Sequence, residues 1–480
     1  MVQAVSPPAD RPKEAKRRTR PGGEPTAEEE ADQTESLNRR ALALARYYQG
    51  KIETISKVPV RSLADFALWY TPGIASVSKS IAVDPDASFE LTGRWNTIAI
   101  VTDGSRVLGL GDIGPCAALP VMEGKALLFK YLGGVDAFPL PIDVADAEAL
   151  IETVVRISPA VGGINLEDIA SPKCFRVLEE LQSRLSIPVW HDDQLGTAAA
   201  TVAALLNALG LTQRAMRELR LVLLGAGAAN ITTARLLLKL GADPHRLSLV
   251  DHRGILHAER EDMDELMLRN PWKYRLALTT DGGGRRGTLA DALVGADVLL
   301  AASSSNPETV RPAWIRSMAP RPIVFALANP IPEIWPATAH EAGAAIVATG
   351  RSDFPNQVNN SLVFPAVFRG VLDARAQSIP DEMVLVAAKE LAARAADRGV
   401  RVDHLLPTME ETEVFPYVAA AVADAAVRLG LARRKRSHEE FLAEARERMQ
   451  RPRQLAAELY AAKLTRPMPD EPPESTTRGS

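Results

Sequence analysis

Two short apolar segments, residues 161–165 and 187–190, are each followed by acidic residues. Between them, Pro172 opens a helical pattern of apolar residues. A strand, a crossover helix and a second strand normally form a right-handed parallel unit, so both strand ends should lie at the same edge of one sheet. The carboxylates expected to meet at that edge belong to Glu167, Asp168, Asp192 and Asp193.

Four carboxylates at one edge of a sheet repel one another unless a cation neutralises them. Ligands that are all oxygen atoms suit Mg2+ or Mn2+. For any one of these acids, a helix cap or a solvated loop residue is the more usual role. Two acidic clusters at the ends of successive strands are harder to explain in that way, and they predict a metal site.

Two further residues lie where a side chain could do acid–base chemistry. Tyr70 directly precedes residues 71–73 (TPG), which form a turn between two helical patterns. Such a tyrosine either projects its hydroxyl into a cleft or is a buried aromatic residue with a hydrogen-bonded hydroxyl. Lys125 lies on the apolar side of a helical segment, where a lysine either extends its amine to solvent or is a desolvated base. The pattern leaves both alternatives open for each residue.

A third stretch has the pattern of a dinucleotide-binding loop. The strand at residues 220–224 runs directly into GAGAAN and then a helix, and the next strand ends in Asp251. The glycines allow a tight turn and a close approach to the pyrophosphate, and the acid is placed for the ribose hydroxyls. Asn230 departs from the pattern, which has a small residue there for close packing of helix on strand. The predicted cofactor-binding positions are Gly225, Ala226, Gly227, Ala228, Ala229, Asn230 and Asp251.

The elements around these residues indicate an α/β fold. Residues 96–102 form a strand, and residues 107–110 are its hairpin partner or the next strand. Later segments repeat the alternation of apolar strands with helical patterns. Further strands are expected at residues 135–140, 297–301, 323–327 and 345–348, and Ala-rich helices at 382–398 and 414–429.

The expected organisation is an N-terminal α/β catalytic domain followed by a Rossmann-type doubly wound NAD(P)-binding domain, with C-terminal helices packing back on the first domain. Both ends of the chain are too polar to offset the entropy of ordering. The predicted bounds are 1–35 for a disordered N-terminal tail, 36–196 for the catalytic and metal-binding domain, 197–370 for the Rossmann domain, 371–432 for the C-terminal helices, and 433–480 for a charged helical segment and a disordered tail.

The composition is that of an ordinary soluble globular protein. The 480-residue chain has a formal net charge of −4, and its basic residues are spread among acids, so no nucleic-acid partner is expected. No apolar run approaches the roughly 18–20 residues of a membrane span. Cys116 and Cys174 are expected to be buried free thiols, which fits a reducing cytosol. These features predict a cytoplasmic protein.

Taken together, the motifs resemble those of the malic enzymes. The similar segments occur in the family's order and lie between residues 36 and 431. They are YTPG at 70–73, TDGSRVLGLGDIGP at 102–115, MEGKALLFK at 122–130, GGINLEDI at 162–169, HDDQLGTA at 191–198, GAGAAN at 225–230, FALANP at 325–330 and NNSLVFPAV at 359–367.

The resemblance implies oxidation of (S)-malate with NAD or NADP and a divalent metal, followed by decarboxylation through oxaloacetate and enolpyruvate to pyruvate and CO2. The implied metal ligands are Glu167, Asp168 and Asp193. Lys125 would be the general base, oriented by Asp192, and Tyr70 the acid that protonates enolpyruvate. A lysine base requires a pKa near neutrality, which desolvation can provide. The residues implied in holding the substrate are Arg106, Asn329, Asn359 and Asn360, and Asn329 would also line the cofactor site.

Several features are left open by the motifs. Asp251 should repel a 2′-phosphate, which favours NAD, but His252 and Arg253 could accommodate that phosphate, so NADP is an alternative. Leu195 departs from the family's motif and is expected to alter packing beneath the site. The resemblance also implies a homodimer or homotetramer. A malolactic-type enzyme that releases lactate and a catalytically silent, metabolite-sensing member are the alternative functions.

Overall fold

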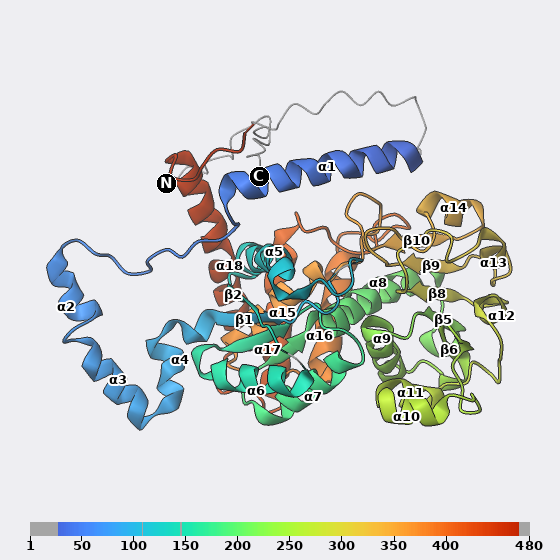
Figure 1. Cartoon of the computed structure of the whole chain (residues 1–480), viewed down its shortest axis with the longest axis horizontal. Helices are drawn as coiled ribbons and strands as arrows, with labels where there is room; N and C mark the ends of the chain where they lie inside the picture. Colours follow the sequence, from blue (N-terminus) through green and yellow to red (C-terminus); the bar gives the residue numbers. More distant parts are fainter. Residues whose placement is uncertain (1–26, 108, 145, 470–480) are drawn as a thin grey trace, which may run out of the picture. The chain divides into compact units, whose positions relative to one another are not determined.

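The computed structural model describes residues 27–107, 109–144 and 146–469 (Figure 1). They divide into two compact units, one made of the residues up to Thr54 together with those from Gln454, and the other of Ile55–Arg453. The first unit contains α1 (Ala27–Tyr48), whose Tyr47 carbonyl oxygen accepts a hydrogen bond of 2.6 Å from Arg466. Every site residue predicted from the sequence lies in the second unit.

Helix α1 begins at Ala27, so the prediction that residues 27–35 lack stable structure is wrong. The sequence at the start of the helix, AEEEAD, is rich in Ala and Glu, which are strong helix formers. A polar composition therefore does not exclude a helix here. The remaining parts of the predicted tails, residues 1–26 and 470–480, lie outside the described residues.

The N-terminal sheet of the second unit is parallel throughout, with strand order β2-β1-β3-β4. Helix α7 (Lys173–Arg184) connects β3 to its neighbour β4. This arrangement confirms the predicted parallel unit, which carries the two acidic clusters to one edge. The strands are β1 (Thr97–Thr102), β2 (Asp136–Pro141), β3 (Gly163–Leu166) and β4 (Val189–His191).

The strand predicted at residues 107–110 does not form at the described positions 107, 109 and 110. Val107 makes only an isolated bridge with Gly111, and the N–H of Leu110 donates a hydrogen bond of 2.9 Å to the carbonyl oxygen of Val107. The chain turns back on itself within four residues, which leaves no length to pair with β1. This loop lies at the carboxyl end of β1, where it becomes part of the candidate site.

The second sheet has the order β10-β9-β8-β5-β6-β7 and is parallel except for the last strand. The chain leaves β5 towards β6 and later returns to the other side of β5 as β8. In doubly wound folds, ligands bind at the carboxyl ends of the strands where the strand order reverses in this way. The strands are β5 (Leu221–Leu224), β6 (Leu247–Asp251), β7 (Gly254–Ile255), β8 (Val298–Ala301), β9 (Ile323–Ala326) and β10 (Ile346–Thr349).

Helices surround both sheets (Figure 1). Those before the second sheet are α2 (Phe66–Trp69), α3 (Ile74–Val83), α4 (Ser88–Leu91), α5 (Gly114–Gly133), α6 (Ala147–Ile157) and α8 (Thr197–Thr212). Those that follow are α9 (Ala228–Lys239), α10 (Met263–Arg269), α11 (Pro271–Thr279), α12 (Leu289–Leu293), α13 (Pro312–Arg316), α14 (Pro336–Glu341), α15 (Phe364–Asp373), α16 (Asp381–Ala396), α17 (Phe415–Arg428) and α18 (His438–Ala461).

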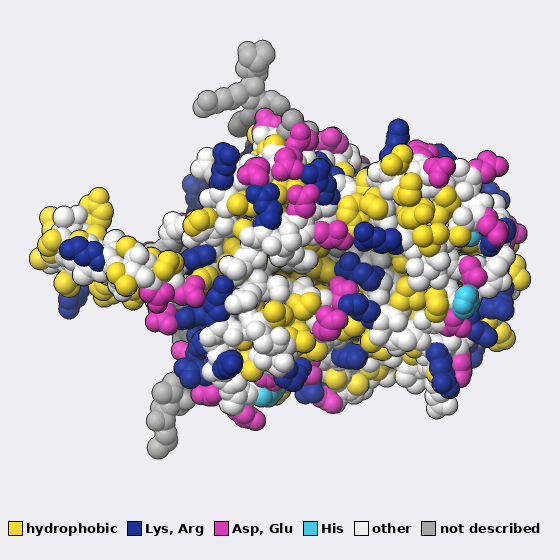
Figure 2. All heavy atoms as spheres, turned by 90° about the horizontal axis from the view of Figure 1, so that it is seen from below, with side chains coloured by type: hydrophobic (Ala, Val, Ile, Leu, Met, Phe, Trp, Pro, Cys, Tyr) yellow, Lys and Arg dark blue, Asp and Glu magenta, His cyan; other side chains and the backbone are white. Residues whose placement is uncertain are grey.

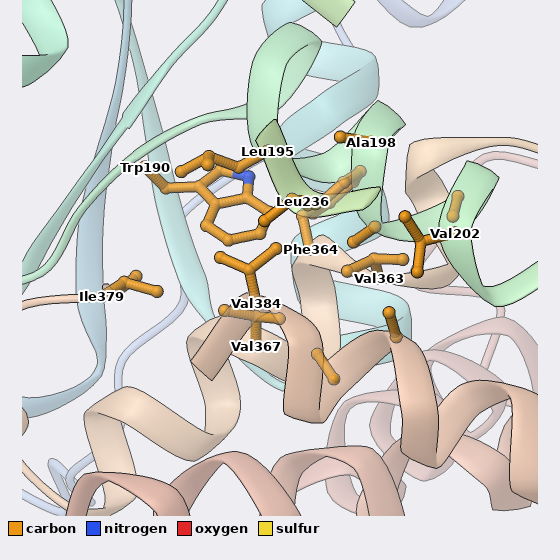
Figure 3. Close-up of a cluster of buried hydrophobic side chains, with 14 of the residues drawn as sticks. Trp190, Leu195, Ala198, Val202, Leu236, Val363, Phe364, Val367, Ile379 and Val384 are labelled. Atoms are coloured by element: carbon orange, nitrogen blue, oxygen red, sulfur yellow. The ribbon is translucent and has the colours of Figure 1, made fainter. Parts of the chain in front are cut away.

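One hydrophobic core joins the two sheets and the C-terminal helices. Trp190 of β4, Leu236 of α9 and Phe364 of α15 meet in it, and all three are buried (Figure 3). Val384 of α16 lies in the same cluster. The predicted return of the C-terminal helices to the first domain is therefore confirmed, and their burial fixes the elements that carry the site.

The segment Asp192–Thr212, which includes α8, is long and apolar enough to span a membrane by length and composition. This corrects the expectation that no such run exists. The segment is 67% buried inside the protein, in the core between the two sheets. A buried core helix passes the same length and composition test as a membrane span.

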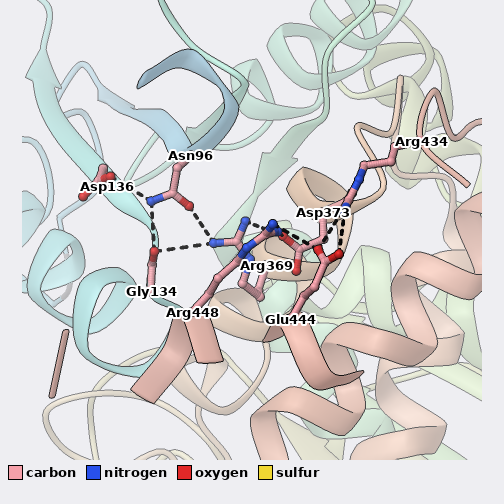
Figure 4. Close-up of polar contacts among 8 residues, drawn as sticks. All are labelled: Asn96, Gly134, Asp136, Arg369, Asp373, Arg434, Glu444 and Arg448. Atoms are coloured by element: carbon pink, nitrogen blue, oxygen red, sulfur yellow. Dashed lines mark hydrogen bonds and ion pairs between the residues drawn. The ribbon is translucent and has the colours of Figure 1, made fainter. Parts of the chain in front are cut away.

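Polar groups also connect the C-terminal helices to the first sheet (Figure 4). Arg369 of α15 is fully buried and pairs with Asp373 at 2.7 Å. Its Nη1 donates a hydrogen bond of 2.6 Å to Oδ1 of Asn96, whose amide in turn donates to the carbonyl oxygen of Gly134. Arg448 of α18 contacts the same Asp373 carboxylate. Burial nevertheless outweighs these partners and lowers the pKa of Arg369, so the guanidinium depends on every contact that it makes.

Both cysteines are free, but only one has the predicted environment. Cys174 is buried in α7, and burial raises the pKa of its thiol above the usual value. Cys116 is exposed on α5, so the prediction of burial is wrong for that residue. Neighbouring Leu119 is exposed as well, which shows that this side of α5 does not face the core.

Candidate active site

Three carboxylates converge beyond the ends of β3 and β4. Glu167, Asp168 and Asp193 each offer an oxygen atom, and these atoms all lie within 4.8 Å of one another. The N–H of Asp168 donates a hydrogen bond of 2.9 Å to Oδ2 of Asp193, and Asn165 donates one of 3.0 Å to Oε2 of Glu167. Asp168 has a φ of 55°, a left-handed conformation that few residues other than glycine adopt. The predicted cluster therefore forms, and its backbone is held in an unusual conformation to do so.

The charges of this cluster suit a divalent cation. Burial raises the pKa of both Glu167 and Asp193, and the neighbouring carboxylates raise that of Glu167 further. His191 lies nearby, with Nδ1 3.8 Å from Asp193, but burial lowers its pKa to about 3 and so keeps the ring neutral. A cation among the three carboxylates would stabilise their ionised forms, and their oxygen ligands fit Mg2+ or Mn2+.

Lys125 points from α5 into the same cluster. Its Nζ lies 2.8 Å from Oε1 of Glu167 and also contacts Asp192, and it sits 4.4 Å from the centre of the Phe364 ring. Burial lowers the pKa of Lys125, but the two carboxylates outweigh burial, so the pKa is raised above its usual value. The pKa near neutrality that desolvation alone would give is therefore not reached, because both carboxylates stabilise the ammonium form.

Asp192 is a buried carboxylate that contacts the amine of Lys125. The residue is completely buried, and Trp190 Nε1 donates a hydrogen bond of 2.9 Å to its Oδ1, while Oδ2 contacts the lysine. The chain then forms a single π-helical turn, Asp192–Gly196. A Cβ at Gly196 would lie 2.0 Å from Oδ1 of Asp192, so only glycine fits there. The sequence motifs did not single out Trp190, although a residue two positions before Asp192 was well placed to reach it.

The loop after β1 packs against the metal-binding segment. The N–H of Arg106 donates a hydrogen bond of 3.0 Å to the carbonyl oxygen of Asp168. Ser105 connects the loop in both directions, because its hydroxyl donates to Asp103 at 2.6 Å and accepts from the N–H of Ala170 at 2.9 Å. The Arg106 side chain is exposed, and its charge helps to lower the pKa of Asp193 against the effect of burial. Arg106 therefore lies at the mouth of the acidic cluster.

The three predicted asparagines occupy different environments. Asn359 uses both ends of its amide within the chain, donating to the carbonyl oxygen of Gly350 at 3.2 Å and accepting from Ser361 at 2.9 Å. Within the described ranges, the amides of Asn329 and Asn360 form no hydrogen bond with the protein. These two amides are consequently better placed than Asn359 to bind a ligand.

The positions of Asn360 and Asn329 follow from the atoms that lie close to two glycines. A Cβ at Gly196 would lie 3.0 Å from Cβ of Asn360, which puts Asn360 beside Asp192. A Cβ at Gly109 would lie 3.1 Å from the carbonyl oxygen of Asn329, so the loop after β1 reaches the segment after β9. Asn360 therefore lies beside the buried Asp192, and Asn329 lies beside the loop after β1.

The GAGAAN segment forms the predicted turn between β5 and α9. Gly225 has a φ of 94°, and a Cβ there would collide with the carbonyl oxygen of Ala302. No atom lies within 4 Å of a Cβ placed at Gly227, so space is open in front of the helix N-terminus for a phosphate. Asn230, which departs from the small residue of the pattern, is accommodated between the helix and the strands. Its buried amide donates to the carbonyl oxygens of Leu224 at 2.7 Å and Leu300 at 3.2 Å, and so joins β5 to β8.

Asp251 ends β6 as predicted, but its carboxylate is already surrounded by donors. It accepts hydrogen bonds from the N–H of Arg253 at 2.8 Å and from Arg260 at 3.0 Å, and it contacts Lys273 of α11. Burial raises the pKa of Asp251, but these donors outweigh burial and lower it overall. Two cations next to Asp251 reduce the repulsion that it would exert on a 2′-phosphate.

Comparison with known families identifies the chain. Residues 49–182 match the malic enzyme N-terminal domain, and residues 195–427 match the malic enzyme NAD-binding domain. The chain belongs to the malic enzyme family. The two matched regions carry the acidic cluster and the GAGAAN turn, respectively.

Curated malic enzymes align with most of the chain. The NAD-dependent malic enzyme of Geobacillus stearothermophilus is 46% identical over 385 residues, which cover 80% of this chain and 78% of the relative. The bifunctional malic/malolactic enzyme of Bacillus subtilis is 46% identical over 83% of this chain and 95% of its own. The NADP-dependent malic enzyme of Halomonas elongata is 42% identical over 81% and 93%. Relatives named as NAD-dependent and as NADP-dependent are therefore both similar to this chain.

Solved malic enzyme structures share the fold. The Entamoeba histolytica malic enzyme superposes with a TM-score of 0.91 at 42% identity, covering 94% of each chain. The Pyrococcus horikoshii malic enzyme has a TM-score of 0.84 at 43% identity, covering 89% of this chain and 99% of its own. These matches confirm the predicted α/β architecture with a Rossmann-type domain.

Leu195, where the sequence departs from the family's motif, is a core packing residue. Leu195 is buried in the core close to Trp190 and takes no part in the acidic cluster (Figure 3). The expectation that it changes packing beneath the site without removing a ligand agrees with this position.

Tyr70 is the predicted site residue that the structure leaves apart from the others. It ends α2 with 70% of its surface exposed. In the part of the chain that the structure describes, its side chain forms no hydrogen bond, ion pair or ring contact. A buried aromatic residue and a hydroxyl directed into a cleft were the two alternatives, and neither describes Tyr70 in a single copy of the chain.

Proposed function

We propose that this malic enzyme family member catalyses the oxidative decarboxylation of (S)-malate to pyruvate and CO2 with reduction of NAD(P). The observation that carries the proposal is the contact of Lys125 with both Asp192 and Glu167, at the edge where three carboxylates meet. A base, an acidic cluster and a dinucleotide turn in one unit supply the groups that such a reaction needs.

In this proposal Lys125 accepts the proton of the malate 2-hydroxyl, and Asp192 keeps the amine directed at it. The amine must first lose its proton. A divalent cation held by Glu167, Asp168 and Asp193 would oppose the ammonium form of Lys125, because it would compete for the Glu167 carboxylate. The buried Trp190–Asp192 hydrogen bond holds the geometry while this charge changes.

Glu167, Asp168 and Asp193 would hold Mg2+ or Mn2+, which supplies Lewis-acid polarisation of the substrate oxygens. Arg106 would bind a malate carboxylate, since a guanidinium can clamp a carboxylate through two hydrogen bonds. Asn329 and Asn360 would add donors from the other side of the cluster. The turn at Gly225–Asn230 would bind the pyrophosphate of NAD or NADP.

Tyr70 would provide the last proton of the reaction. When the C3–C4 bond of oxaloacetate breaks and CO2 leaves, its electron pair forms the C2–C3 double bond. The C2 carbonyl pair moves to the oxygen, which takes back the proton held by Lys125 and gives enolpyruvate. The hydroxyl of Tyr70 then donates its proton to C3 while Lys125 takes the enol proton, which gives pyruvate, and solvent restores the proton of Tyr70.

A second candidate function is that of a malolactic enzyme, which releases lactate. It is supported by the relative from Bacillus subtilis, whose name includes both activities. The two functions share the oxidation and decarboxylation of malate and differ in whether pyruvate leaves or is reduced.

The test is to incubate the purified full-length protein with malate and either NAD or NADP, with and without Mn2+. The absorbance of the reduced nicotinamide and the identity of the carbon product are then measured. Malate-dependent reduction of the cofactor together with pyruvate supports the main proposal. Lactate without net cofactor reduction supports the malolactic function, and no malate turnover with either cofactor rejects both.

A further inference from the structure

Glu333 is a buried acid that forms no ion pair with the Lys, Arg and His residues that the structure describes. Charged side chains are spread over the face of the molecule shown in Figure 2, whereas Glu333 has no exposed surface. Its carboxylate accepts hydrogen bonds from uncharged N–H and O–H groups, and burial raises its pKa. A buried charge without an ion-pair partner is costly unless such hydrogen bonds replace the lost water. The groups that Glu333 holds in place therefore have to account for its burial.

The two carboxylate oxygens of Glu333 bind two different loops. Oε1 accepts hydrogen bonds from the N–H of Ser303 at 2.6 Å and from the Ser303 hydroxyl at 3.2 Å. Oε2 accepts one of 3.1 Å from the N–H of Ala328. Ser303 follows β8 and Ala328 follows β9, and these strands are parallel neighbours in the second sheet (Figure 1). One side chain thus joins the loops at the carboxyl ends of two adjacent strands.

The loop after β8 reaches the proposed cofactor turn. A Cβ at Gly225 would lie 2.3 Å from the carbonyl oxygen of Ala302 and 3.1 Å from Cβ of Ser303. Gly225 opens the GAGAAN turn, which is proposed to bind the pyrophosphate of NAD(P). Ser303 therefore lies between this turn and the carboxylate of Glu333.

The loop after β9 reaches the proposed substrate site. Asn329, whose amide is proposed to bind malate, directly follows Ala328. A Cβ at Gly109 would lie 3.1 Å from the carbonyl oxygen of Asn329, so this residue also borders the loop after β1. The N–H group that Glu333 holds is thus one residue away from a proposed malate-binding amide.

Further hydrogen bonds keep the two loops together without the Glu333 carboxylate. The hydroxyl of Ser305 donates to the carbonyl oxygen of Ile331 at 3.0 Å and accepts from the Ile331 N–H at 2.8 Å. The N–H of Val310 donates to the backbone carbonyl oxygen of Glu333 at 3.0 Å. A change to the Glu333 side chain leaves these contacts in place, so the loops keep their course while the contacts next to Asn329 and Gly225 are altered.

We infer that Glu333 is a positioning residue that links the cofactor turn to the malate-binding segment, so that each ligand orders the binding site of the other. The inference rests on the proposed function, because that proposal assigns malate to Asn329 and NAD(P) to the GAGAAN turn. Malate bound at Asn329 restrains the neighbouring Ala328. Glu333 passes this restraint to Ser303, beside the cofactor turn. Two ligands that favour the same arrangement of shared residues raise each other's affinity.

Glu333→Gln tests the link, because it keeps the size of the side chain and replaces one hydrogen-bond acceptor with a donor. The two oxygens of a carboxylate both accept, whereas the NH2 group of a glutamine cannot accept from a backbone N–H. The variant therefore holds the N–H of Ser303 or that of Ala328, but not both. Glu308→Gln is the matched control, because Glu308 is exposed on the loop after β8.

Hydrogen–deuterium exchange followed by mass spectrometry measures the link without turnover. The full-length protein is incubated with saturating malate and Mn2+ but no cofactor, so that malate is not oxidised. Amides of the loop after β8 should then exchange more slowly in the wild type and in Glu308→Gln, and this slowing should be lost in Glu333→Gln. Equal slowing in Glu333→Gln overturns the inference. Unchanged exchange in the wild type also overturns it, and that result does not depend on the folding of any variant.

Initial rates with malate and NAD(P) varied together give a second measurement. They yield the factor by which each substrate raises the apparent affinity for the other, which should be about fivefold or more in the wild type and about 1 in Glu333→Gln. Both KM values should rise in the variant with little change in kcat, because Glu333 touches neither substrate. Damage to the fold alone would lower kcat and leave the coupling factor unchanged, and that outcome overturns the inference.

Failure of the inference and failure of the proposed function give different results. No malate turnover by the wild type with NAD or NADP rejects the proposed function, and the role of Glu333 with it. Turnover by the wild type without any effect of malate on the loop after β8 rejects only the link through Glu333.

Discussion

Oε1 of Glu167 lies 2.8 Å from Nζ of Lys125, and both groups are almost completely buried. One carboxylate therefore contacts the proposed base and also belongs to the proposed metal-binding cluster. Their charges are linked, because a cation that binds Glu167 weakens the attraction that keeps Lys125 protonated. This link makes the acidic cluster part of the machinery that prepares the base.

Replacing Lys125 with Ala removes the proposed base and leaves the three carboxylates in place. Malate oxidation should fall by about 10²- to 10⁴-fold, the usual contribution of a general base. Mn2+ binding, measured by calorimetry, should persist. The matched control is Lys130→Ala on the same helix, where the amine pairs with Asp136 at the surface and activity should stay near wild type. Near wild-type turnover by Lys125→Ala would exclude the proposed role.

Replacing Asp193 with Asn removes one charge from the acidic cluster. Affinity for Mn2+ should fall by roughly 100-fold or more, since even residues that only support metal ligands contribute about 10- to 100-fold. Removal of metal by a chelator should abolish malate oxidation by the wild-type protein, and Mn2+ should restore it. Glu180→Gln is the control, because this acid pairs with Arg176 away from the cluster. Equal Mn2+ affinity in both variants would argue against a metal site.

Replacing Trp190 with Phe removes the hydrogen bond to Asp192 and retains most of the buried ring. A hydrogen bond to a buried charge contributes about 1.5–3 kcal/mol. The kcat should therefore fall by roughly tenfold or more, with a smaller change in the KM for malate, because Trp190 positions Asp192 and does not touch substrate. Trp272→Phe is the control, since its indole bonds an exposed Glu179. If both variants keep the wild-type kcat, the hydrogen bond does not position the base.

Replacing Lys273 with Gln removes one of the cations that neutralise Asp251. The freed negative charge should disfavour a 2′-phosphate, so the ratio of kcat/KM for NAD to that for NADP should rise, by up to about fivefold for an interaction near 1 kcal/mol. Steady-state assays with both cofactors measure this ratio. Arg275→Gln is an exposed change on the same helix and should leave the ratio unaltered. A ratio that falls in Lys273→Gln would contradict the assigned effect.

Replacing Arg369 with Ala breaks the buried network between α15 and the first sheet (Figure 4). Loss of one partner of a buried ion pair destabilises a protein by about 3–5 kcal/mol, so thermal and denaturant midpoints should both drop clearly. Arg375→Ala removes a surface pair with Glu90 and should cost less than about 1 kcal/mol. Similar midpoints for the two variants would mean that burial of Arg369 contributes little.

The sequence alone determined the family, the two α/β domains and the residues that make up the acidic cluster. Glu167 and Asp193 could be placed together because a parallel strand–helix–strand unit brings both strand ends to one edge, whatever the rest of the chain does. The turn at Gly225 was equally local, since strand, glycine and helix follow one another directly. Patterns of apolar spacing and turn residues are enough for such features.

Only the tertiary structure decided the electrostatic surroundings and the contacts of these groups. The pKa of Lys125 depends on carboxylates from β3 and β4, and the charge of Asp251 depends on Lys273 from a later helix. Asn230 proved to be a link between two strands and not an obstacle to packing. The exposure of Tyr70 could be seen only once α2 and α3 were placed in space. Each of these properties arises from contacts between residues distant in the chain, for which local periodicity carries no information.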